Sequence, residues 1–113
     1  MTWLVTGGAG YIGAHVVRAL AAAGLSPAVI DDLSSGHASF VPAGVPFVQG
    51  TILDLPLVEQ TLRDYAVEGV IHVAGFKAAG VSVHRPLHTY EQNVDATRIV
   101  LEAMQRQNVS NIV

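Results

Sequence analysis

Cysteine is absent from the 113-residue sequence, which excludes a disulfide framework and a thiolate metal site. Basic residues are few: six Lys and Arg side chains stand against nine Asp and Glu, for a formal charge of -3. Without a basic stripe, we expect neither nucleic acid nor an anionic membrane as a partner. The sequence also lacks a signal peptide and any run of about eighteen apolar residues, so we expect a soluble, cytoplasmic domain with no membrane association.

Hydrophobic residues make up 50% of the sequence, and their short runs alternate with helical patterns. This alternation predicts an α/β fold: a Rossmann-like, doubly wound parallel sheet that forms one domain over residues 1–113. Because the last apolar run stops abruptly, we expect a domain truncated at about the fifth strand, with a C-terminal substrate domain absent. The predicted strands are 2–6, 28–30, 47–49, 70–73 and 111–113, and the predicted helices are 11–23, 55–67 and 86–107.

A glycine cluster follows the first predicted strand and opens the first predicted helix. Gly8, Gly10 and Gly13 fit the G-x-G-x-x-G pattern, and Gly7 adds a fourth glycine. Bare backbone lets a pyrophosphate approach closely, and the first turn of a helix offers unpaired N–H groups to it. The pattern and its position therefore favour a dinucleotide site, and a tight turn of an ordinary α/β protein is the alternative.

An acidic residue, Asp31, ends the second predicted strand eighteen residues after Gly13. This is the expected place for a carboxylate that accepts hydrogen bonds from the ribose hydroxyls of a dinucleotide. No Lys or Arg lies between Arg18 and Arg63 to attract a 2′-phosphate, so NAD is favoured over NADP. For Asp32, a solvated loop carboxylate and a ligand contact are equally good interpretations.

The fourth predicted strand ends in small residues, Val73–Gly75, which leave room for a ribose or nicotinamide beside the backbone. Lys77, the only lysine of the sequence, follows just beyond this carboxyl end, where ligands bind in α/β sheets. We therefore expect Lys77 to contact the ligand. His84 and His88 have helical spacing but no acidic third ligand at a suggestive spacing, so we expect no metal site.

Four segments of the sequence resemble the UDP-glucose 4-epimerase family, within the extended short-chain dehydrogenase/reductase superfamily. They are VTGGAGYIG, the acidic residue that follows the second predicted strand, DDLSSG and VIHVAGFKAAGVSVHRPLHTYEQNV, and the resemblance covers nearly all 113 residues as the N-terminal portion of such an enzyme. It implies NAD as the cofactor and a UDP-sugar as the substrate. The cofactor-binding residues that we expect are Gly7, Gly10, Tyr11, Ile12, Gly13, Asp31, Asp32, Leu33, Ser34, Ser35, Gly36, Thr51, Ile52, Val73, Ala74, Gly75, Lys77 and Gln92.

Two of these positions depart from the family pattern. Thr51 stands where family members carry the aspartate that binds the adenine amino group, and Gln92 stands where several have asparagine near the cofactor. A threonine hydroxyl replaces only part of the aspartate contact. Another NDP-sugar dehydratase, decarboxylase or reductase, or a non-catalytic NAD-sensing module, therefore stays an alternative.

The resemblance also implies an isomerase that interconverts UDP-glucose and UDP-galactose through transient oxidation at C4. The catalytic tyrosine of such enzymes precedes a lysine by four residues, but Tyr11, Tyr65 and Tyr90 are followed at that spacing by His15, Gly69 and Val94. We therefore expect no catalytic residue in this chain. Residues 1–113 alone are expected to bind NAD weakly and to be inactive.

The long predicted helix 86–107 carries two apolar faces. Its main stripe contains Leu87, Tyr90, Val94, Leu101 and Met104, and we expect it to cover the sheet. A second face of small residues, Ala96, Val100 and Ala103, is expected to pack against another subunit. The resemblance implies a homodimer formed through helices that include this one.

Overall fold

The computed structural model describes residues 1–113 as five strands and their connecting helices. The strands are β1 (Thr2–Thr6), β2 (Ser26–Asp31), β3 (Phe47–Gln49), β4 (Val67–His72) and β5 (Asn111–Ile112). The helices are α1 (Tyr11–Ala22), α2 (Leu55–Asp64), α3 (Ala79–His84), α4 (Pro86–Tyr90) and α5 (Ala96–Arg106), with a 3₁₀ turn η1 (Ala38–Phe40) and a π-helical turn η2 (Glu91–Asp95).

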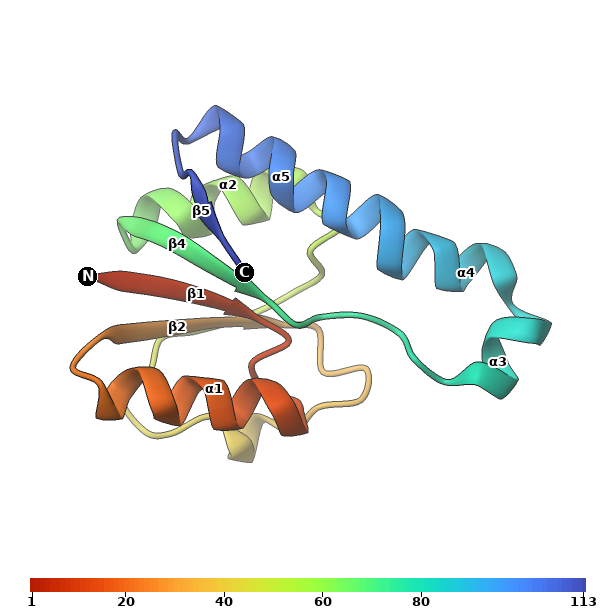
Figure 1. Cartoon of the computed structure of the whole chain (residues 1–113), viewed down its shortest axis with the longest axis horizontal. Coiled ribbons are helices and arrows are strands. Elements are labelled where there is room, and N and C mark those ends of the chain that lie inside the picture. Colours follow the sequence, from red (N-terminus) through yellow and green to blue (C-terminus); the bar gives the residue numbers. More distant parts are fainter.

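All five strands are parallel and lie in the order β3-β2-β1-β4-β5. Helix α1 covers one face of the sheet, while α2 and α5 lie side by side on the other (Figure 1). The chain reverses its direction across the sheet between β1 and β4, and open α/β sheets bind ligands outside the carboxyl ends at such a point. The predicted Rossmann-like fold is confirmed.

The sheet is buried on both faces, which explains strands without polar alternation. Leu4, Ile30 and Val70 point towards α2 and α5 and belong to a core of 13 buried residues. Val5 and Val29 point to the opposite face and pack with Val17 of α1. Alternate residues of β1 thus fill two cores, one on each side of the sheet.

The helix ends follow from local chemistry with one unpredicted boundary. As expected, the Asp54 carboxylate caps α2 by accepting the backbone N–H of Leu57 at 3.2 Å. Gly24, just beyond α1, has a φ of 80°, as a helix-terminating glycine should. Helix α2 ends at Asp64, three residues earlier than predicted, because Ala66 adopts a φ of 48° and Val67 already belongs to β4.

The long helix predicted over residues 86–107 is interrupted. Helices α4 and α5 are joined by the π-helical turn η2, in which the Ala96 N–H reaches back to the carbonyl of Glu91. Helix α3, which precedes them, was not predicted. Both α3 and α4 extend past the carboxyl ends of the strands (Figure 1).

The two apolar faces of this helical segment were assigned the wrong way round. Ala96, Val100 and Ala103 are fully buried against the sheet. Of the main stripe only Met104 is buried, while its other large apolar side chains point to solvent; they are Leu87, Tyr90, Val94 and Leu101. The physical reason is the π-helical turn, which shifts the helical phase of α5 relative to α4. The small side chains let α5 approach the sheet closely.

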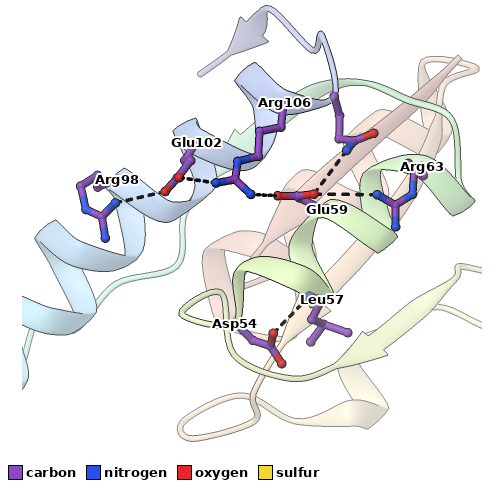
Figure 2. A network of polar contacts seen from close by, with 8 residues as sticks. Asp54, Leu57, Glu59, Arg63, Arg98, Glu102 and Arg106 are labelled. Carbon is purple, nitrogen blue, oxygen red and sulfur yellow. Dashed lines mark hydrogen bonds and ion pairs between the residues drawn. The ribbon is translucent and has the colours of Figure 1, made fainter.

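A row of charged side chains joins α2 to α5. The Glu59 carboxylate of α2 lies 3.1 Å from the Arg106 guanidinium of α5 and 3.8 Å from that of Arg63. Glu102 continues the row by pairing with Arg106 at 2.9 Å and with Arg98 at 3.1 Å (Figure 2).

None of the helices has the length and apolar character that a membrane span requires.

Candidate functional site: a dinucleotide cleft

The glycine turn between β1 and α1 is held by close backbone contacts. Gly7 has a φ of 70°, and a Cβ there would lie 2.9 Å from the Ala74 backbone. A Cβ on Gly13 would lie 2.1 Å from the Gly7 carbonyl oxygen. Both positions therefore require glycine for the turn itself.

Gly10 differs from these two glycines. A Cβ on Gly10 would meet one atom within 4 Å, the Gly7 carbonyl oxygen at 3.3 Å, which is a tight contact but less severe than those at Gly7 and Gly13. Gly10 is the N-cap of α1, and no side chain caps this helix. The first turn thus keeps its partial positive charge and unpaired N–H groups for an anion from outside the chain.

Asp31 lies at the carboxyl end of β2, and its side chain is fixed by two backbone donors. One carboxylate oxygen accepts the N–H of Ala9 at 3.0 Å, and the other accepts the N–H of Leu33 at 2.8 Å. These bonds hold the carboxylate beside the glycine turn. Each carboxylate oxygen retains a second lone pair for a ligand hydroxyl.

A cavity of about 440 Å³ opens where these elements meet. Its lining includes 16 of the 18 residues predicted from the sequence, and they come from the turn after β1, from α1, from the end of β2 and the loop after it, from the segments after β3 and β4, and from η2. Ile30 also lines the cavity and was missed, since its apolar side chain belongs to the core. The predicted residues in the lining are Gly7, Gly10, Tyr11, Ile12, Gly13, Asp31, Asp32, Ser34, Ser35, Thr51, Ile52, Val73, Ala74, Gly75, Lys77 and Gln92.

The two other predicted residues, Leu33 and Gly36, do not line the cavity. Leu33 has a φ of 62°, and its N–H donates to the Asp31 carboxylate. Gly36 packs against the glycine turn, because a Cβ there would lie 2.7 Å from the Ala9 carbonyl oxygen. Both residues shape the loop after β2.

A second cavity of about 300 Å³ adjoins the first. The two share Lys77, Gln92 and the loop after β2, and the second adds Phe76, Ala78 and His88 as its own lining. These three residues were not predicted. His88 belongs to α4, which was not predicted as a separate helix. Its ring and the ring of Phe76 are arranged edge to face, with a centroid distance of 5.2 Å.

Thr51 is one of the two departures from the family pattern, and the hydrogen bonding of its hydroxyl is defined. Its Oγ1 accepts the N–H of Leu53 at 3.1 Å, which leaves the hydroxyl proton free for a ligand acceptor. An aspartate at this place accepts hydrogen bonds only, whereas this threonine is set up to donate one. The cavity wall at Thr51 therefore has a different hydrogen-bonding pattern from the one that the resemblance implies.

No three His, Asp or Glu side chains lie close enough together to hold a metal ion. His72, at the end of β4, is hydrogen-bonded on both ring nitrogens, to Thr6 at 2.7 Å and Thr97 at 3.0 Å. Its burial lowers the pKa of the imidazole below the ordinary value. His72 is therefore a half-buried, neutral residue whose two ring nitrogens are both hydrogen-bonded.

Relatives and solved structures agree on one family. The UDP-glucose 4-epimerase of Azospirillum brasilense is 43% identical over 110 residues, which are 97% of this chain and 32% of that protein. The enzyme of Lactobacillus helveticus is 42% identical over 113 residues, all of this chain and 34% of that protein. The chain spans about a third of the length of the curated relatives that it matches.

The solved structures are equally similar. The Thermus thermophilus UDP-glucose 4-epimerase in complex with NAD superposes with a TM-score of 0.95 at 39% identity, covering 99% of this chain and 36% of that one. The Brucella ovis UDP-glucose 4-epimerase in complex with NAD gives a TM-score of 0.94 at 40% identity, over 98% of this chain and 34% of that one. The model of the NAD dependent epimerase/dehydratase family matches residues 3–113, and the chain belongs to this family.

Proposed function

We propose that residues 1–113 form the NAD-binding domain of a UDP-glucose 4-epimerase. The observation that carries this proposal is one continuous cavity from Asp31, past the uncapped N-terminus of α1, to Ala74 and Lys77 at the end of β4. These three regions correspond, in this order, to the adenosine, the pyrophosphate and the nicotinamide half of a dinucleotide. The similarity to NAD complexes of UDP-glucose 4-epimerases supports the same assignment.

The residues present fit NAD by shape and charge. The Asp31 carboxylate accepts hydrogen bonds from the adenosine ribose and disfavours a 2′-phosphate. The backbone of Gly10 and the first turn of α1 bind the pyrophosphate, in the space that the missing Cβ of Gly10 leaves. The remaining, nicotinamide half then lies between Ala74 and Gln92. Bound NAD supplies a reversible hydride acceptor for the sugar, and this chain binds and orients it.

The whole protein's reaction, the interconversion of UDP-glucose and UDP-galactose, is part of the proposal. None of the three tyrosines precedes a lysine by four residues, so the groups that move the sugar protons are proposed to lie outside residues 1–113. Thr51 leaves another NDP-sugar enzyme as the second candidate, because it changes the adenosine contacts. The cytoplasmic location stays a prediction from the sequence.

Titration of the chain with NAD, with matched glycine variants, tests the binding. We expect Gly10→Ala to weaken NAD binding at least tenfold, about 1.4 kcal/mol, with a smaller loss in the free energy of unfolding from the tight contact with the Gly7 carbonyl oxygen. Gly80→Ala is the control, since a Cβ on Gly80 meets nothing within 4 Å. Unaltered NAD affinity in Gly10→Ala would contradict the proposed cradle. Turnover of a different NDP-sugar by the whole protein would favour the second candidate.

We further propose that the protein forms a homodimer through the outer face of α4 and α5. Leu87 and Tyr90 of α4 and Val94 of η2 are exposed at spacings of three and four residues, and Leu101 of α5 is exposed beyond the π-helical turn. Isologous pairing of such a stripe with a second copy removes it from water. Sedimentation velocity should find a dimer, and Tyr90→Glu should shift it to monomer. Ala23→Glu, on exposed surface beyond α1, is the control and should remain dimeric. A monomeric unmodified protein would contradict the proposal.

A further inference from the structure

A continuous series of hydrogen bonds runs through His72 from one wall of the cleft to the other. The Ala74 N–H donates to Thr6 Oγ1 at 3.2 Å, and Thr6 Oγ1 lies 2.7 Å from His72 Nδ1. On the other side, His72 Nε2 lies 3.0 Å from Thr97 Oγ1, whose hydroxyl donates to the Asn93 carbonyl at 2.7 Å. The series therefore links β1 and β4 to the π-helical turn η2.

The direction of these bonds fixes the tautomer of His72. The Thr97 proton is used on the Asn93 carbonyl, so Thr97 Oγ1 accepts and His72 Nε2 must carry the donated hydrogen. Nδ1 is then the acceptor for the Thr6 hydroxyl. With the hydrogen on Nδ1 instead, the Thr6 proton would have no acceptor, although Thr6 is fully buried. A fully satisfied series thus requires the neutral Nε2–H form.

Both ends of the series reach residues that line the cleft. Ala74 lines the main cavity, and a Cβ on Gly7 would already touch its backbone. Asn93 follows Gln92, which lines both cavities. The Asn93 side chain also holds the Phe76 backbone twice, accepting its N–H at 2.6 Å and donating to its carbonyl at 2.8 Å. His72 is thus the centre of a hydrogen-bonded connection, here called the brace, between the cavity wall at Ala74 and the cavity wall at Gln92.

The π-helical turn is the part of this brace that an ordinary helix would not supply. In this turn the Asn93 carbonyl accepts the Thr97 hydroxyl, the Asn93 side chain holds the Phe76 backbone beyond β4, and Gln92 lines the cavity. Such turns are costly and cluster at functional sites. Retaining one at the cavity wall indicates that the position of Gln92 matters for the ligand.

We propose that His72, in its neutral Nε2–H form, is a positioning residue for the nicotinamide half of NAD, because it fixes the separation of the Ala74 and Gln92 walls. The inference rests on the proposed function. The adenosine ribose is assigned to Asp31 at β2 and the pyrophosphate to α1, so the other half of the ligand must lie at the end of β4. His72 itself does not line the cavity and acts through Ala74 and Asn93.

Two variants of Thr97 test the brace with matched chemistry. Thr97→Val removes the hydroxyl but keeps the shape, and Thr97→Ser keeps the hydroxyl. We expect Thr97→Val to weaken NAD binding about fivefold, the equivalent of one hydrogen bond, and to leave ADP-ribose, which lacks the nicotinamide, within about twofold. Thr97→Ser should bind both like the unmodified chain. Equal losses for NAD and ADP-ribose in Thr97→Val would overturn the inference.

A second test of the inference uses NMR of the unmodified chain. Nitrogen-15 NMR of the His72 ring should identify Nε2 as protonated, and NAD but not ADP-ribose should shift the signals of Gln92 and Asn93. An Nδ1–H tautomer, or equal shifts with both ligands, would overturn the inference. A chain that binds neither NAD nor ADP-ribose would instead refute the proposed function, so the two failures are distinguishable.

Discussion

The carboxylate of Asp31 accepts the backbone N–H of Ala9 at 3.0 Å, which ties the end of β2 to the glycine turn after β1. The two residues are 22 positions apart in the sequence. Through this bond, the group proposed to read the ribose and the turn proposed to hold the pyrophosphate form one rigid unit. Asp31 therefore serves the fold and the ligand with the same side chain.

The Asp31→Asn variant removes the charge and, because an amide nitrogen cannot accept, one of the two backbone hydrogen bonds of the carboxylate. We expect the preference for NAD over NADP to fall about tenfold, because the amide no longer repels a 2′-phosphate and accepts fewer hydrogen bonds from the ribose. Calorimetric titration with both dinucleotides measures the ratio. Asp64→Asn, at the exposed end of α2, is the control for the lost charge. Equal affinity of the unmodified chain for NAD and NADP would refute this role of Asp31.

Lys77 is expected to contribute a modest, salt-dependent part of the affinity. It lines both cavities and is exposed, so its attraction for the pyrophosphate is screened by water. Lys77→Gln should weaken NAD binding about threefold at low salt, and less at high salt. Arg18→Gln removes the same charge from a residue of α1 outside the cavity and should change nothing. An identical effect of both variants would mean that only net charge matters.

Glu59 is expected to stabilise the contact between α2 and α5. Its carboxylate is only 16% exposed and meets both Arg63 and Arg106. Glu59→Gln should lower the free energy of unfolding by about 1 kcal/mol at low salt, and by less near 1 M salt, where charges are screened within about 3 Å. Urea denaturation measures the difference. Glu91→Gln, without an ion pair, should unfold like the unmodified chain.

His72 predicts how stability depends on pH. Burial lowers the pKa of His72 in the folded chain, so below pH of about 6.5 the unfolded chain binds a proton that the folded chain does not. The free energy of unfolding should therefore fall as the pH drops from about 6.5 towards the folded pKa. His72→Asn should lose this contribution, whereas His37→Asn, at an exposed position just before η1, should retain it. Matching pH profiles for all three proteins would contradict the prediction.

Features set by neighbouring residues could be predicted from the sequence. The glycine turn depends on a few consecutive backbone positions, the Asp54 cap on a side chain three residues from its partner, and Asp31 on the end of one strand. Apolar runs also revealed every strand, because strands buried on both faces lack polar alternation. The cleft followed from these local features and the order of the strands.

Features that depend on tertiary packing could not be predicted. Regular 3.6-residue spacing carried the stripe from Leu87 to Met104 as one face, but the π-helical turn changes the phase between them. Which face of α5 meets the sheet is then decided by how closely Ala96 and Ala103 let it approach. The role of His72 was equally hidden, since its partners Thr6 and Thr97 lie 66 and 25 residues away.

Helices α3 and α4 contain no buried residue, so the half of the cleft beside them should open locally more easily than the half beside the sheet. Segments with so little buried surface open at a small fraction of the energy that global unfolding requires, so their amides should exchange with solvent far faster than those of β1. The end of the cleft proposed to bind the adenosine rests on the sheet, which we expect to exchange slowly, and the other end adjoins α3 and α4. A dinucleotide would therefore be released from the side of α3 and α4 first, with its adenosine as the last anchored part.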